Sequence, residues 1–362
     1  MFRHALFLLL IVSLPFARVA AQDEPLDAGY DIGFDCPVAQ TLDPAGDTLW
    51  VLFQGCFTGD YTLQAFAVAD GAPLALTSNF AAELEPLADV FYFDRATSPL
   101  AFLDDHTLSI RYSDADTYAP HSIVVSLDGS APAAPVIADD ALGGLLSQHA
   151  EYPEATVYSH DQRQAAVVNA SELLVLDLTT GDVIFSLPLE PDSYNGFPSF
   201  APDGRTLYVA TLDDFNDMDN YHSTLALYSL PDGVLRGSAG VPAPFVTVSP
   251  DARYAAVELG SNDGTSSSLS LVDLTSGATI RSFSLYEPTT KAMTCVNDGR
   301  DMSDVDFKRS GRLSLAGLDW LPDSSGIIFT RSYRGEGAGG GRPCVFDYSR
   351  LNRVDLVAST GG

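Results

Sequence analysis

The chain has 362 residues, of which 46% are hydrophobic and 19% are charged, a composition typical of a folded globular protein and not of a disordered or fibrous one. Its 19 Lys and Arg residues stand against 48 Asp and Glu residues, which gives a formal net charge of −29. Affinity for nucleic acids comes largely from cationic side chains that neutralise phosphates, so this balance argues against nucleic acid as a partner.

Residues 1–21 have the pattern of an export signal. Arg3 and His4 precede an apolar run from Ala5 to Leu14, and small residues end the segment at Ala21. The run is too short to cross a bilayer and no later stretch approaches about 20 apolar residues, so no transmembrane anchor is expected. The pattern predicts a secreted protein, extracellular or periplasmic. Residues 22–33 follow as a linker or as an extra strand.

The four cysteines are expected to form disulfides, because an exported chain folds in an oxidising compartment. A hairpin centred near Gly46 would place Cys36 opposite Cys56, within bridging reach. That pairing leaves Cys295 for Cys344.

A two-part pattern recurs six times along the chain. Its first part is a turn of the form S-P-D-G before an apolar strand, in which Pro presets the turn, Asp bonds its own backbone and Gly supplies positive φ. The six turns begin at Asp43, Leu103, Ser159, Ala201, Ser249 and Leu321.

The second part is an alternating strand that ends in a small turn. Leu174 to Gly181 and Leu271 to Gly277 are clear copies, and Cys344 to Arg350 is the last one. Each unit therefore supplies four strands, and six units fill residues 34 to 359. Helix is expected only in Asn79 to Asp89 and Val136 to Gln148.

Four-strand units at this spacing predict an all-β chain, a β-propeller over residues 34–362 with six four-stranded blades and an insertion at 286–311 between the last two. A seventh, degenerate blade in Ala131 to Tyr152 is the alternative. The last unit is expected to contain its own fourth strand, Arg353 to Ala358. The ring would then close by sheet packing alone, or by a strand added from residues 22–33.

Ala201 to Val209, together with Thr179 to Gly181, resembles the repeat signature of WD-repeat-like propellers of the TolB-like type. The resemblance extends over nearly the whole mature chain. It implies the propeller fold and no particular activity, because such propellers host many functions.

Two clusters in the long loops are candidate sites. The loop over residues 211–221 gathers oxygen ligands that suit Ca²⁺, but it lacks the Gly and the distal Glu of an EF-hand loop, so we expect a solvated acidic loop without a tight cation. Its candidate ligands are Asp213, Asp214, Asn216, Asp217 and Asp219.

The second cluster is basic and lies in the nearly neutral C-terminal part of the chain. It is expected either to dock onto acidic loops of the same chain or to receive an anionic partner. A glycine run at residues 335–341 is expected to form a mobile loop beside it. The basic residues are Arg300, Arg309, Arg312, Arg334 and Arg342.

The sequence contains no nucleophile elbow, no zinc-protease motif and no sialidase-type Asp box. We therefore expect a secreted, monomeric, non-enzymatic propeller without a cofactor, which binds an extracellular protein or glycan through its long-loop face. The alternative is a Ca²⁺-dependent hydrolase or lactonase with its site in the central channel. Acidic side chains from several blades that converge on the axis would favour the alternative.

Overall fold

The structure is a computed structural model of the chain. It describes residues 24–25, 30–33, 36–54, 60–76, 80–89, 99–113, 119–150, 156–169, 171–189, 195–212, 223–241, 246–260, 267–285, 311–339 and 342–356.

The described residues form six sheets in which consecutive strands pair antiparallel. The first sheet is β3 (Cys36–Leu42), β4 (Thr48–Gln54) and β5 (Tyr61–Ala67), and the second is β6 (Leu100–Asp104), β7 (Thr107–Ser113) and β8 (Pro120–Ser126). The third is β9 (Val157–Tyr158), β10 (Gln164–Val168), β11 (Glu172–Asp177) and β12 (Val183–Pro188). The fourth is β13 (Asn195–Phe200), β14 (Thr206–Leu212), β15 (Ser223–Ser229) and β16 (Val234–Val241). The fifth is β17 (Val246–Val248), β18 (Tyr254–Gly260), β19 (Ser267–Asp273) and β20 (Ala278–Ser284), and the sixth is β21 (Gly311–Trp320), β22 (Gly326–Gly339) and β23 (Arg342–Asp355).

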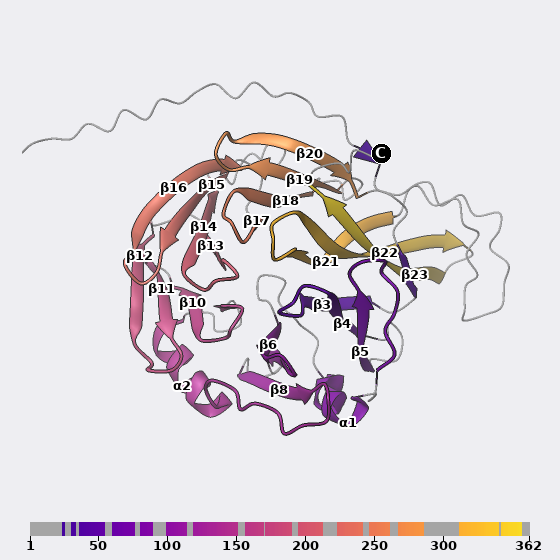
Figure 1. The fold of residues 1–362 in the computed structure, drawn as a ribbon, viewed down its shortest axis with the longest axis horizontal. Helices are drawn as coiled ribbons and strands as arrows, with labels where there is room; N and C mark the ends of the chain where they lie inside the picture. Colours follow the sequence, from indigo (N-terminus) through magenta and orange to yellow (C-terminus); the bar gives the residue numbers. More distant parts are fainter. Residues whose placement is uncertain are drawn as a thin grey trace, which may run out of the picture.

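The sheets follow one another in chain order around a ring, with the first strand of each sheet nearest the centre (Figure 1). This arrangement is propeller-like, as the repeats predict. The first and second sheets have three strands where four are expected. In the first sheet, only an isolated bridge joins Phe66 to Pro73 at the outer position, because a proline has no N–H to donate to a ladder.

The helices lie where the sequence predicts them. A short α1 (Ala81–Leu84) continues into a 3₁₀ turn (Glu85–Asp89), and α2 (Asp139–His149) packs against β8. Residues 131–150 contain this helix and no strand, so a seventh blade in this segment is wrong. In the part of the chain that the structure describes, no helix is long and apolar enough to span a membrane.

Five of the six turns after the first strands contain a residue with positive φ, which confirms the repeat there, whereas the turn that begins at Leu103 has none and is tighter, with Asp104 opposite Thr107. Asp161, Asp203, Asp251 and Asp323 each accept a hydrogen bond at Oδ1 from the backbone N–H two residues later, at 2.8 to 3.1 Å. The following residue of the turn has positive φ whether or not it is a glycine. The positive-φ residues of these turns are Gly46, Gln162, Gly204, Ala252 and Ser324.

An apolar cluster joins neighbouring sheets at five of the six boundaries, and at the boundary between the second and third sheets the cluster comes from α2 and the third sheet. One of these clusters joins the first sheet to the sixth, where Leu49, Val51 and Phe53 meet Leu321 and Ile328. The ends of the repeated region are therefore in contact. Burial of apolar side chains on both faces of each sheet is the main force that holds the ring together.

Residues from the N-terminal region complete the sixth sheet. β2 (Tyr30–Gly33) pairs antiparallel with β23 at its outer edge, and β1 (Glu24–Pro25) pairs parallel with β20 of the fifth sheet. The expectation of a fourth strand at Arg353 to Ala358 is wrong, because residues 353–355 belong to β23, the third strand.

Candidate functional site

The hairpin of β22 and β23 is the first candidate site. Each strand has 14 residues, where the other strands have at most 10. The extra length lies at the end of the sheet where second strands meet third strands, which we call the loop face. In Figure 1 the hairpin projects beyond the ring. The expectation of a loop is wrong for residues 335–339, because β22 stays paired with β23 from Gly326 to Gly339. The hydrogen bonds of this ladder hold the glycines in a strand despite their low strand propensity. Residues 340 and 341 lie outside the described residues.

The strand register brings predicted arginines together. Arg312 of β21 lies opposite Arg334 of β22, and Arg334 in turn lies opposite Asp347 of β23. Arg342 begins β23 at the tip, opposite Gly339. The sequences of β21, β22 and β23 contain six arginines and four acidic residues, whereas the whole chain has a net charge of −29. This is a local excess of positive charge.

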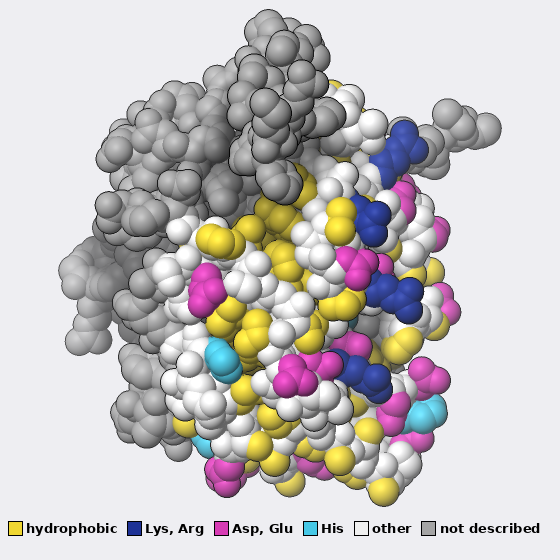
Figure 2. Space-filling view, turned by 90° about the vertical axis from the view of Figure 1, so that its left-hand side faces the viewer, with side chains coloured by type: hydrophobic (Ala, Val, Ile, Leu, Met, Phe, Trp, Pro, Cys, Tyr) yellow, Lys and Arg dark blue, Asp and Glu magenta, His cyan; other side chains and the backbone are white. Residues whose placement is uncertain are grey.

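The outer side of the third and fourth sheets has a different surface. Figure 2 shows basic and acidic side chains interspersed there, with apolar side chains between them. The exposed apolar residues of the outer strands include Val183, Val234, Leu235 and Ile280. No single sign of charge dominates that view, so the hairpin is the more distinctive charged element.

Several predicted site residues lie outside the described residues. These are Arg300 and Arg309 of the insertion, and the candidate cation ligands Asp213, Asp214, Asn216, Asp217 and Asp219 between β14 and β15. Among the residues that the structure describes, no group of three or more His, Cys, Asp or Glu side chains is placed to hold a metal ion.

The disulfide prediction is also untested, because Cys56 and Cys295 lie outside the described residues. Cys36 begins β3, and Cys344 lies in β23 opposite Gly337 of β22. One premise is wrong: a bulge between Pro37 and Ala39 places Cys36 opposite Gln54 and not opposite Cys56.

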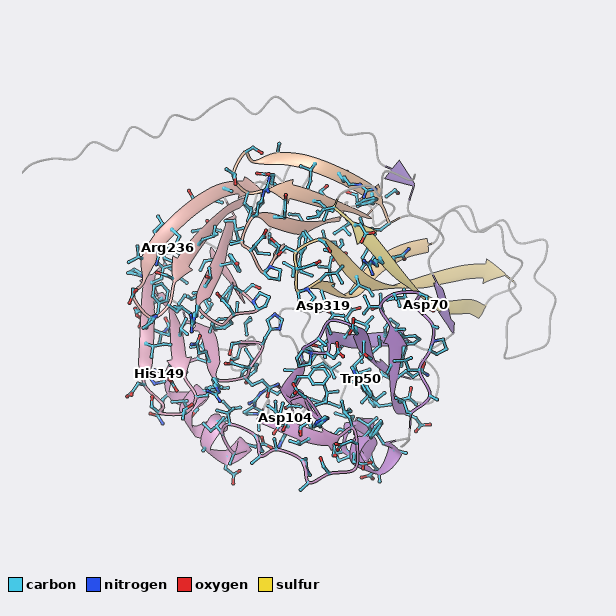
Figure 3. All side chains as sticks on the ribbon, viewed as in Figure 1. Trp50, Asp70, Asp104, His149, Arg236 and Asp319 are labelled. Carbon is cyan, nitrogen blue, oxygen red and sulfur yellow. The ribbon has the colours of Figure 1, made fainter. Side chains whose placement is uncertain are left out.

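A buried polar network near the axis is a second candidate, and sequence analysis missed it. Asp319 lies on β21, the innermost strand of the sixth sheet, beside the centre of the ring (Figure 3). Gln40 of β3 donates from Nε2 to Asp319 Oδ2 at 2.7 Å and to the carbonyl of Ile328 at 3.2 Å. Gln40 Oε1 accepts from the backbone N–H and the hydroxyl of Thr330, at 2.9 and 2.8 Å.

This network joins the first sheet to the sixth, and it uses every hydrogen-bonding atom of the Gln40 amide. Gly317 makes room for it, because a Cβ atom there would lie within clashing distance of Gln40 Cγ. The carboxyl group of Asp319 is enclosed although the residue keeps some contact with solvent. Desolvation raises its pKa from 3.8 to about 7, and the hydrogen bond from Gln40 opposes this shift.

Asp319 occurs in the sequence as one of many acidic residues, so no local signal distinguishes it. Its chemistry follows from burial and from a partner 279 residues away. The contact between Gln40 and Asp319 joins the first sheet to the sixth beside the centre of the ring.

Comparisons with known proteins add little. No protein-family model matches the chain, and no curated protein sequence matches it. Among solved structures the chain is similar to hydrazine synthase of Kuenenia stuttgartiensis, with 13% sequence identity, coverage of 88% of this chain and 80% of that chain, and a TM-score of 0.39. A TM-score this low does not establish a shared fold, so the propeller-like arrangement is inferred from the sheets and turns of this chain alone.

Proposed function

We propose that the chain is a secreted, monomeric, six-bladed β-propeller that binds an anionic extracellular protein or glycan through its loop face, without catalysis. In this proposal residues 1–21 are the export signal, and β2 completes the sixth blade. The six sheets in ring order and the apolar contact between the first and sixth sheets support the blade count.

The observation that carries the binding proposal is the arginine register of the sixth sheet. Arg312 lies opposite Arg334, and Arg331 lies opposite Arg350. Arg334 also lies opposite Asp347, and Arg350 also lies opposite Asp31. Arg312 and Arg331 have no acidic residue opposite them in the register, so they are the arginines left for an anionic group of a partner, while the surrounding acidic protein repels the same partner elsewhere.

The proposal predicts salt-dependent binding to polyanions. We expect the mature chain, started at residue 22, to bind at least one of three probes: heparin, polygalacturonate or an acidic peptide. The affinity should fall as NaCl rises from about 50 to about 300 mM, because exposed charges are screened. Isothermal titration calorimetry measures it directly.

The test variant is Arg312→Gln with Arg334→Gln, which should lower the affinity by about tenfold or more. The matched control is Arg163→Gln with Arg205→Gln, which removes the same charge from two exposed turn residues on the opposite face and should bind as the native chain does. Equal losses in both variants, or no binding to any probe, would contradict the proposal. Turnover of a lactone or glycoside panel would replace it with the channel hydrolase.

A further inference from the structure

The boundary between the second and third sheets differs from the other five. Its apolar cluster comes from α2 and the third sheet, with residues such as Leu142, Leu146 and Leu174, and takes no side chain from β7. Leu108 and Ile110 of β7 face the first sheet instead. Because side chains alternate along a strand, the β7 residues that face the third sheet are polar.

Three of these polar residues are almost completely buried. Thr107, Ser109 and Arg111 have exposed fractions of 1%, 0% and 5%. A buried arginine is expensive to desolvate, so its guanidinium normally has a carboxylate partner. This boundary is therefore the one place in the ring where a full cation replaces apolar packing among the described residues.

Only one nitrogen atom of the Arg111 guanidinium, Nε, donates a hydrogen bond. Its Nε donates to Gln162 Oε1 at 3.0 Å, and its central carbon lies 4.6 Å from the centre of the Tyr158 ring. Nη1 and Nη2 are both buried and contact no hydrogen-bond acceptor in the part of the chain that the structure describes. Gln162 Nε2 and Ser109 Oγ are buried without a partner in the same way.

No acidic side chain of the described residues forms an ion pair with Arg111. Asp139 is near enough to act on it electrostatically, but its carboxylate accepts from the backbone N–H and the hydroxyl of Ser122, at 3.1 and 2.8 Å. Burial raises the pKa of Tyr158 to about 12, so its phenol stays neutral at physiological pH. The direct contacts of the guanidinium are therefore a cation–π contact and a neutral hydrogen bond, and Asp139 acts on it only at longer range.

We propose that this boundary holds a carboxylate-binding site, in which Nη1 and Nη2 of Arg111 bind the two oxygens of a small organic acid. The two Nη groups present parallel N–H donors at the spacing of a carboxylate, which is the geometry of a bidentate arginine contact. The free amide of Gln162 lies beside the guanidinium through the bond at Nε, and Ser109 stands two residues earlier on the same face of β7. The Tyr158 ring lies against the guanidinium and makes the cation–π contact that helps to position it.

The carboxylate can come from a free small acid or from the end of a longer ligand, such as a peptide C-terminus. The site belongs to the second and third sheets, whereas the arginine hairpin belongs to the sixth. Its test is therefore independent of the function proposed above.

The experiment measures the melting temperature of the mature chain at constant ionic strength, with acetate, formate, nitrate or chloride as the anion. Acetate and formate should raise it by about 2 °C or more above the chloride baseline, because a ligand that binds only the folded state stabilises it. Arg111→Met should abolish the rise, and Arg111→Lys should reduce it by removing the fork. Arg205→Met, at an exposed arginine, is the matched control and should keep the full rise.

A calorimetric titration of the native chain and of Ser109→Ala with acetate keeps the proposal testable if the Arg111 variants do not fold. Ser109→Ala should weaken binding severalfold. A parallel titration uses a tetrapeptide with a free C-terminus and the same tetrapeptide with an amidated C-terminus. If the free peptide binds more tightly than acetate and the amidated peptide does not bind, the natural ligand is a terminal carboxylate. A rise with nitrate as large as the rise with acetate, or no rise above chloride with any anion, would overturn the proposal.

Discussion

At the scale of single residues, the carboxyl group of Asp319 links stability to pH. It keeps its proton up to about pH 7 in the folded chain, whereas an exposed Asp loses it near its ordinary pKa of 3.8. Between these values folding takes up a proton, so the free energy of unfolding decreases as pH rises. The contribution of neutral Asp319 is complete below the unfolded pKa and is lost as pH rises through about 7.

We therefore expect Asp319→Asn to flatten the stability profile between about pH 4 and about pH 7. The variant should gain stability relative to the native chain at the upper end of this range, because it needs no buried charge there. Urea unfolding at a series of pH values measures this difference. Asp323→Asn is the control: hydrogen bonds of its turn lower the pKa of Asp323, so its loss should cost stability only above the pKa. Parallel profiles for native and Asp319→Asn proteins would show that the carboxyl group is not enclosed.

At the scale of elements, the turns that follow the first strands of neighbouring sheets lie in close contact. Gly46 has φ of +78°, and a Cβ atom there would lie 2.6 Å from Pro322 Cγ in the corresponding turn of the sixth sheet. This glycine is needed for both its conformation and its lack of a side chain. Gly144 of α2 has neither constraint, because nothing lies within 4 Å of its Cβ position.

These two glycines make a matched pair of tests. Gly46→Ala should destabilise the chain by about 2 kcal/mol or more, because it combines left-handed strain with a clash against a rigid ring. Gly144→Ala should stabilise it by about 0.5 to 1 kcal/mol, since alanine is the better helix former. Chemical unfolding of both variants gives the two values. Equal effects of one sign would show that the turn and the helix are not as described.

At the scale of the whole molecule, the N-terminal strands hold the last two sheets. β2 covers the outer edge of β23, and β1 lies on β20. Because β2 pairs with β23, its removal should leave an open edge at the sixth sheet. The loss of stability should be greatest in the sixth sheet, which packs against the first sheet where the ring closes.

A chain that starts at residue 34 should therefore melt several degrees below a chain that starts at residue 22, and the amide protons of β23 should exchange faster. The amides of β14 and β15, in the fourth sheet, are the internal control and should keep their protection. Unchanged exchange in β23 would contradict a closing role for β2.

The sequence by itself determined the repeated units, the turn chemistry at residues such as Asp203 and Gly204, the positions of the two helical segments, and the acidic balance with its basic C-terminal part. These features follow from local patterns, because a turn or an alternating strand is specified by residues next to one another. The tertiary structure decided the pairing of β2 with β23, the opposition of Arg312 and Arg334, and the burial of Asp319 and Arg111. Each of these depends on segments far apart in the chain, such as Gln40 and Asp319 at a separation of 279 residues, and only the closed packing of the sheets brings them together.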